Sequence, residues 1–173
     1  KDHKRIIFNG DGYDEAWVKE AEKRGLYNFK TTPDALAHML DEKNVTLFTS
    51  HNVYSKTELV ARHEVLLENY CKIINIEALT MLDMARKDIL PAMSEYSATL
   101  ARDAAAKTSF DPDADCTYEK ENIKNLCALI GACNRAVKKT EQDLISAKSI
   151  TDGAELAEFY KSTIIDDMKA IRI

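Results

Sequence analysis

The residues best suited to chemistry form the acidic segment "DPDADCTYEKEN", from Asp111 to Asn122. Aspartates at its first, third and fifth positions match the loop of an EF-hand calcium site. That loop also needs glycine at its sixth position and a bidentate glutamate at its twelfth, where this chain has Cys116 and Asn122. We therefore predict a solvated acidic loop that caps the next helix, rather than a calcium site.

The other candidate motifs are incomplete. The glycine-bearing stretch "NGDG" matches neither the GxGxxG pattern nor the P-loop pattern of phosphate-binding sites. Di-iron bundles use Glu-x-x-His pairs, and no histidine here follows a glutamate by three residues; the histidines are His3, His38, His51 and His63. No serine or cysteine has the His and acid pattern of an activated nucleophile. The sequence therefore predicts no catalytic, cofactor-binding or metal-binding residue.

Composition indicates a soluble helical protein. The chain has 173 residues, of which 45% are hydrophobic and 31% charged, and this suits one domain, or one domain with an extension, that can bury a real core. Only five glycines and three prolines are present, which favours long uninterrupted helices. A net charge of −5 argues against a nucleic-acid surface. No apolar run approaches the roughly 18 residues of a membrane span.

The cysteines show no CxxC spacing and are expected to be the reduced thiols of a cytosolic protein. Cys71, Cys127 and Cys133 fall within helical patterns, where cysteine usually behaves as a small buried hydrophobe. Cys116 falls in the acidic loop.

Residues 1–54 are expected to form a helix-rich N-terminal subdomain that packs on a helical bundle. A helix is predicted from Asp14 to Arg24, ended by Gly25. A second begins with Thr32 as its N-cap and Pro33 in the first helical position. The β-branched stretch "NVTLFTSHNV", residues 44–53, predicts a short extended segment.

Residues 55–173 predict a long antiparallel bundle. A capping box from Ser55 to Glu58 opens a helix of about 75 Å that runs to about Lys107, with a bend at Pro91. The acidic loop, residues 108–117, leads to a second long helix from about Tyr118 to Ser149. Its apolar stripe has coiled-coil spacing and comprises Ile123, Cys127, Ile130, Cys133, Val137, Thr140, Leu144 and Ala147.

A third helix follows the short break "ITDG", where Asp152 and Glu155 offer another capping box. Because short connections favour antiparallel neighbours, the fold class is mainly α, an up-down-up bundle. The chain stops at "AIRI" within this helical pattern, and we expect it to be a piece of something larger. Polar residues interrupt the first helix's apolar band; they either face solvent or set the helix register, or they pair across an interface with the rest of a larger protein: Asn69, Asn75, Glu77, Thr80 and Asp83.

Two stretches carry a family resemblance. "KRIIFNGDGYDEAWVKEAEKRGLYNFKTTPDAL", followed by "LLENYCKIINIEALTMLDMARKDILPA", resembles the C-terminal region of type III glutamine synthetases. The similarity runs from Lys1 to Ile173 and is strongest through Ala92.

The resemblance implies a full-length cytoplasmic enzyme that joins ammonia to glutamate with ATP and Mg²⁺ or Mn²⁺. The family's catalytic motifs lie upstream and none is present here, so no site residue is carried over. The implied partners are the catalytic domain of the same chain and neighbouring subunits of a ring homo-oligomer. We therefore expect a noncatalytic helical domain that supports assembly or the catalytic domain. The alternatives are a free-standing helical interaction module and a bundle that holds a metal or small ligand.

Overall fold

The computed structural model describes residues 3–172, and their fold is mainly α, as predicted. No strand occurs among these residues. A 3₁₀ turn, Lys4–Ile6, comes first. The α-helices are α1 (Glu15–Lys23), α2 (Thr32–Leu36), α3 (Glu42–Ser50), α4 (Lys56–Met84), α5 (Leu90–Phe110), α6 (Thr117–Ala147), α7 (Gly153–Phe159) and α8 (Ile165–Ile171). Two π-helical turns, Ala85–Ile89 and Tyr160–Ile164, join α4 to α5 and α7 to α8.

The predicted long helix is confirmed as one continuous element made of α4, the first π turn and α5. The Ser55 hydroxyl accepts from the Glu58 backbone N–H, and the Glu58 carboxylate accepts from the Ser55 backbone N–H at 2.8 Å. This is the predicted capping box. The π turn ends two residues before Pro91, which cannot donate a backbone hydrogen bond.

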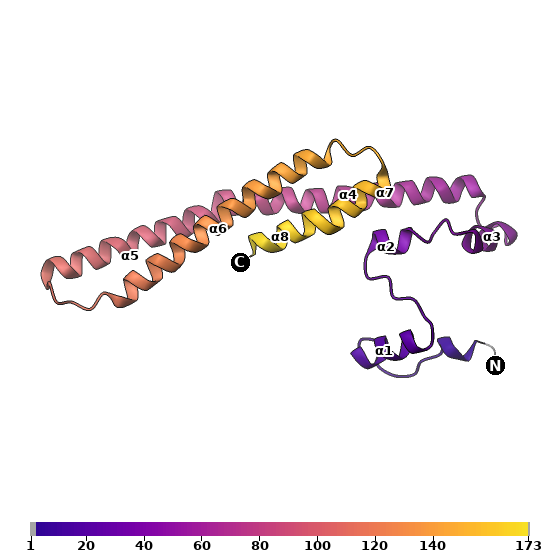
Figure 1. Cartoon of the computed structure of the whole chain (residues 1–173), viewed down its shortest axis with the longest axis horizontal. Coiled ribbons are helices and arrows are strands. Elements are labelled where there is room, and N and C mark those ends of the chain that lie inside the picture. Colours follow the sequence, from indigo (N-terminus) through magenta and orange to yellow (C-terminus); the bar gives the residue numbers. More distant parts are fainter. Residues whose placement is uncertain (1–2, 173) are drawn as a thin grey trace.

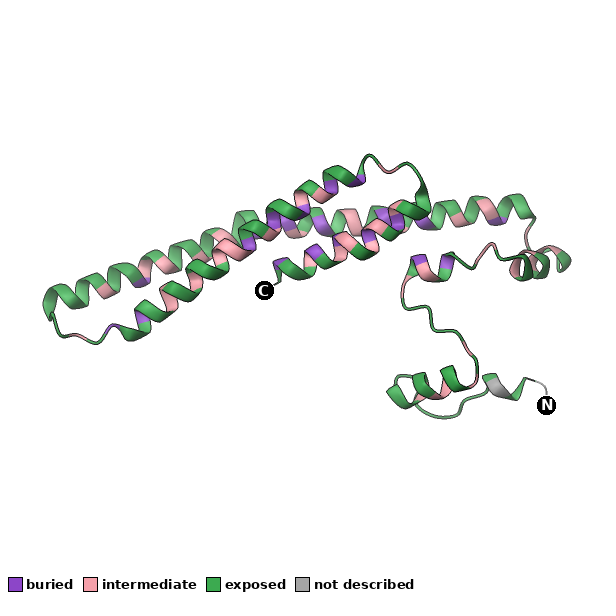
Figure 2. Cartoon of the chain, viewed as in Figure 1, coloured by how far each residue is buried: buried purple, intermediate pink, exposed green. Residues whose placement is uncertain are grey.

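The core forms where a third helical layer covers α4 and α6. Figure 1 shows α7 and α8 lying along these two helices, while α5 and α6 extend beyond them as a two-helix hairpin. Buried residues gather at this crossing (Figure 2), and Ala78, Ala157 and Ile164 are fully buried there. The two alanines let the helix backbones approach closely. Among residues 3–172, no helix is both long and apolar enough to cross a bilayer.

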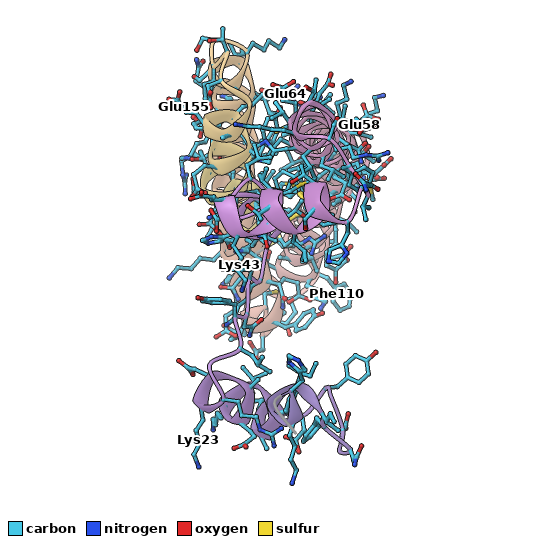
Figure 3. All side chains as sticks on the ribbon, turned by 90° about the vertical axis from the view of Figure 1, so that its right-hand side faces the viewer. Lys23, Lys43, Glu58, Glu64, Phe110 and Glu155 are labelled. Carbon is cyan, nitrogen blue, oxygen red and sulfur yellow. The ribbon has the colours of Figure 1, made fainter. Side chains whose placement is uncertain are left out.

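The N-terminal helices differ in how they meet the bundle. Pro33 and Leu36 of α2 are buried, and Lys161 in the second π turn donates to Asp34 at 2.8 Å. In contrast, α1 has no buried residue. It lies apart from the bundle in Figure 1, and in Figure 3 its Lys23 is far from Glu58 and Glu155.

Two predictions in this region are wrong. The stretch expected to be extended is largely helix α3, because no neighbouring strand is available to pair with it and the Thr49 hydroxyl bonds back to the Val45 carbonyl at 2.8 Å. The N-cap of α2 is Thr31 rather than Thr32, and its hydroxyl accepts from the Asp34 backbone N–H at 3.4 Å. Pro33 consequently lies one position further into the helix.

Three further details depart from the sequence prediction. Helix α5 continues to Phe110, so the loop that joins it to α6 begins at Asp111 rather than at residue 108. Cys127 is exposed, and its Sγ lies 4.0 Å from Ser97 Oγ of α5, so it belongs to the two-helix hairpin of α5 and α6. Cys116, predicted to lie in a solvated loop, is 2% exposed. All four cysteines are free thiols.

Candidate functional site

The acidic loop uses its carboxylates to build turns and to start α6. Asp111 Oδ1 accepts from the Asp113 backbone N–H at 3.0 Å, and Asp115 Oδ1 accepts from the Thr117 backbone N–H at 2.9 Å. Two hydrogen bonds from Thr117 lower the pKa of Asp115. The bond from the Thr117 side chain has the larger effect, and the bond from the Thr117 backbone N–H has the second largest. The Asp115 carboxylate thus satisfies the first backbone N–H of α6, whereas the N-cap residue itself, Cys116, makes no side-chain capping hydrogen bond.

An ion pair between a buried glutamate and a half-exposed lysine closes the same end of the hairpin. Glu119 is 5% exposed, and its Oε1 accepts from Lys107 Nζ of α5. This hydrogen bond is the main reason that the pKa of Glu119 lies below its usual value. The Cys116 thiol donates to the Ala104 carbonyl at 3.7 Å. These contacts join α5 to α6 and leave no carboxylate of the pair free for a ligand.

The histidines do not converge. His38 contacts Asp41 at 3.0 Å and stacks on Phe29 with ring centroids 4.6 Å apart, whereas His51 follows α3 and His63 lies on α4. Within the described residues, no group of three His, Cys, Asp or Glu side chains could hold a metal ion. The Mg²⁺ or Mn²⁺ that the family resemblance implies therefore finds no donor set in this part of the chain.

A polar cluster between α6 and α8 was not foreseen from the sequence. Lys139 Nζ donates to Asp143 Oδ2 at 2.7 Å and to Asp167 Oδ1 at 2.5 Å. Burial raises the pKa of Asp167, while the hydrogen bond from Lys139 lowers the pKa of Asp143. Asp167 Oδ2 is buried with no hydrogen-bond partner among the described residues. The spacing of four residues from Lys139 to Asp143 was the available signal, but it does not reveal Asp167 on another helix.

The polar residues within the apolar band of α4 serve two different roles. Asn75 Oδ1 accepts from the Tyr160 hydroxyl at 3.1 Å, which ties α4 to the second π turn. The other four are exposed, as the simpler of the two readings predicts: Asn69, Glu77, Thr80 and Asp83. Asn69 and Thr80 lie within a solvent-facing row of apolar side chains.

That row defines a second apolar face of α4, which we call the outer face. Its residues recur at steps of three and four: Leu66, Asn69, Ile73, Ile76 and Thr80, flanked by Val65 and Met84. Ile73, Ile76 and Met84 are 46%, 62% and 52% exposed. The inner face of the same helix carries buried Leu67, Ala78 and Leu82.

Two open grooves lie along the outer face. One, of about 560 Å³, is lined near the start of α4 by Val65 and Leu66 together with Met39 and Tyr54. The other, of about 570 Å³, lies between the end of α4 and α8, and Ile76 and Met84 form one of its walls. The most evident functional feature of the chain is therefore an apolar surface suited to a macromolecular partner.

Comparisons with known proteins place this chain in a family. The family model described as glutamine synthetase C-terminal domain matches residues 1–108, from the N-terminus through most of α5. The glutamine synthetase of Butyrivibrio fibrisolvens is 38% identical over 98% of this chain. The type-3 glutamine synthetase of Dictyostelium discoideum is 32% identical over 98% of it, and the glutamine synthetase of Bacteroides fragilis is 29% identical over 96%. The chain spans 24% of the length of each relative.

Proposed function

The chain belongs to the glutamine synthetase C-terminal domain family, in agreement with its resemblance to type III enzymes, and from this premise we propose that it is a noncatalytic helical domain. It supports assembly of the enzyme or holds the catalytic domain in place. The full-length enzyme would form glutamine from ammonia and glutamate with ATP and Mg²⁺ or Mn²⁺. Its partners would be the catalytic domain and neighbouring subunits of a cytoplasmic ring.

The outer face of α4 is the observation that carries this proposal. A helix that buries one apolar face in its own core and presents a second apolar face to solvent is suited to join its own domain to another domain or subunit. The ionic groups of the chain support a structural role as well. Lys107, Lys139 and Lys161 each pair with a carboxylate on another helix.

An antibody raised against the chain tests the proposal in a native lysate of cells that make it. We expect an immunoblot band several times heavier than 19.5 kDa, because the chain is 24% of the length of its relatives. Glutamine synthetase activity should be captured with it, and excess purified chain added as competitor should abolish the capture. A band near 19.5 kDa without activity would instead indicate a free-standing interaction module.

A second assay addresses the noncatalytic part of the proposal. The purified 173-residue chain is incubated with glutamate, ammonia, ATP and Mg²⁺, and glutamine is measured. We expect no glutamine above the level of a heat-denatured sample. Glutamine formation that depends on ATP would overturn this part.

A further inference from the structure

We propose that Asn9 is a site of spontaneous modification, at which the asparagine is converted to aspartate and isoaspartate with loss of ammonia. The site belongs to the stretch "NGDG", which has no part in the proposed function, and the inference does not depend on that function. Asn9 and Gly10 lie between the first 3₁₀ turn and α1, outside any helix, and both are exposed. Figure 1 shows this segment and α1 apart from the bundle.

The reaction needs only these two residues and water. The backbone nitrogen of Gly10, after it loses its proton, attacks the side-chain carbonyl carbon of Asn9. A carbon–nitrogen bond forms, the side-chain nitrogen leaves as ammonia, and a five-membered succinimide ring remains. Water then opens the ring at either of its two carbonyl groups. One opening gives aspartate, and the other gives isoaspartate, in which the main chain runs through the former side chain.

The backbone at this site is not held by hydrogen bonds. On one side, the Ile7 N–H donates to the Lys4 carbonyl at 3.1 Å, and on the other the Tyr13 N–H donates to Asp11 Oδ1 at 2.9 Å. Between these contacts, the described residues provide no backbone acceptor for the Gly10 N–H. Glycine also adopts more backbone conformations than any other residue. The attacking nitrogen can therefore reach the Asn9 side chain.

Packing explains why glycine follows Asn9. A Cβ atom on residue 10 would lie 2.5 Å from Phe8 Cζ. Moving the Phe8 ring away would break its stack on Trp17, in which the ring centroids are 4.0 Å apart. The aromatic contact at the start of the chain therefore requires, after Asn9, the residue that hinders ring closure least.

The other asparagines are better protected. None of them is followed by glycine. Asn28 and Asn52 also lie outside helices, but they precede Phe29 and Val53, whose side chains crowd the attacking nitrogen. The rest lie within α3, α4 and α6, where helical geometry fixes the backbone. Modification is therefore expected at Asn9 first.

Positive charge surrounds the site. Asn9 lines a pocket of about 460 Å³ together with Lys4 and Arg24. Arg24 is held there, because its Nη1 donates to the Ile7 carbonyl at 3.0 Å. Nearby cations favour loss of the proton from the Gly10 nitrogen, and they stabilise the carboxylate that replaces the amide. The new negative charge is thus compensated where it forms.

Peptide mapping of the full-length protein tests the proposal. The protein is incubated for several days at pH 7.4 and 37 °C beside an Asn9→Gln variant. The variant is the control because its longer side chain would have to close a six-membered ring, which forms far more slowly. Trypsin cleaves after Arg5 and Lys19, so residue 9 is recovered in the peptide of residues 6–19. Fragmentation in the mass spectrometer assigns the modification to a residue.

We expect deamidated and isoaspartyl forms at Asn9 to accumulate several-fold faster than at Asn28 or Asn52. The rate should rise between pH 7.4 and pH 9, because the attacking nitrogen must lose a proton. The Asn9→Gln variant should show neither form at residue 9. Equal rates at Asn9, Asn28 and Asn52 would overturn the proposal.

A synthetic peptide of residues 6–19 provides the reference rate. If the peptide is modified while Asn9 of the full-length protein stays intact, the protein holds this turn in a conformation that excludes ring closure, and the proposal is wrong. Modification of both confirms that the folded protein leaves the site open.

Discussion

The two faces of α4 have similar side chains and different surroundings. Leu82 on the inner face is 5% exposed, whereas Leu66 on the outer face is 43% exposed. The inner face is covered by α6 and by the third layer of the core, which consists of α7 and α8 (Figures 1 and 2). Hydrophobic periodicity thus shows that a face of a helix needs cover, but it does not show whether that cover comes from the same chain.

The largest expected effect is a difference in the free energy of unfolding between variants on the two faces. Leu82→Ala should lower the free energy of unfolding by about 2–5 kcal/mol, because it leaves a cavity in the core. Leu66→Ala is the matched control on the outer face of the same helix and should cost about 1 kcal/mol or less. Urea denaturation followed by circular dichroism measures both. Equal losses would contradict the distinction between the faces.

A smaller effect is expected at the start of α4. Ser55→Ala removes the hydroxyl that caps the first turn and should cost about 1 kcal/mol. Thr57→Ala, two residues later in the first turn and exposed, is the control and should be close to neutral. The readout is again the midpoint of urea denaturation. If both variants unfold at the same urea concentration as the parent chain, the cap does not contribute to stability.

The two buried carboxylates predict opposite dependences on pH. Burial raises the pKa of Asp167, so the folded state holds its proton more tightly than the unfolded state. Stability from this group is therefore lost as pH rises from the ordinary value of 3.8 through the raised pKa. In Asp167→Asn this contribution to the pH dependence should be absent when the melting temperature is measured between pH 3 and 7. Asp166→Asn, at a 65% exposed side chain, should leave the profile unchanged.

Glu119 has the opposite sign and a more local effect. Lys107 lowers its pKa, so its contribution is present above the ordinary value of 4.5 and is lost as pH falls through the lowered value. Glu119→Gln should reduce hydrogen-exchange protection near the loop from Asp111 to Cys116 at pH 7, with little change in the core. Exposed Glu121→Gln is the control. Equal protection in the two variants would show that the ion pair does not hold the end of the hairpin.

Local signals in the sequence were enough to place the long helices. The capping box at Ser55 and the helix start at Asp152 depend on neighbouring residues, and both are found in the structure. Asp152 caps α7 by accepting from two backbone N–H groups. The helical nature of residues 42–50 was missed because β-branched residues favour strands only where another strand is available.

Features that depend on contacts between helices could not be predicted. The burial of Asp167 and Glu119 depends on Lys139 and Lys107, which lie 28 and 12 residues away in the sequence. The π turn that contains Ile164 likewise has no local signal, since it reflects how the third layer fits against α4 and α6. The absence of a catalytic motif was read from the sequence, whereas the outer face required the structure.

One measurement tests most directly whether the outer face serves association and the inner face stability. Ile76→Glu and Ile145→Glu change isoleucines that are 62% and 58% exposed, but only Ile76 lies on the outer face. Both changes are made in the full-length protein, and its molar mass by light scattering and its melting temperature are measured on the same samples. We expect Ile76→Glu to lower the molar mass of the assembly while it changes the melting temperature by only a few degrees, and Ile145→Glu to leave both unchanged. If Ile76→Glu leaves the molar mass unchanged, or destabilises the fold as much as Leu82→Ala does, the division between the two faces of α4 is wrong.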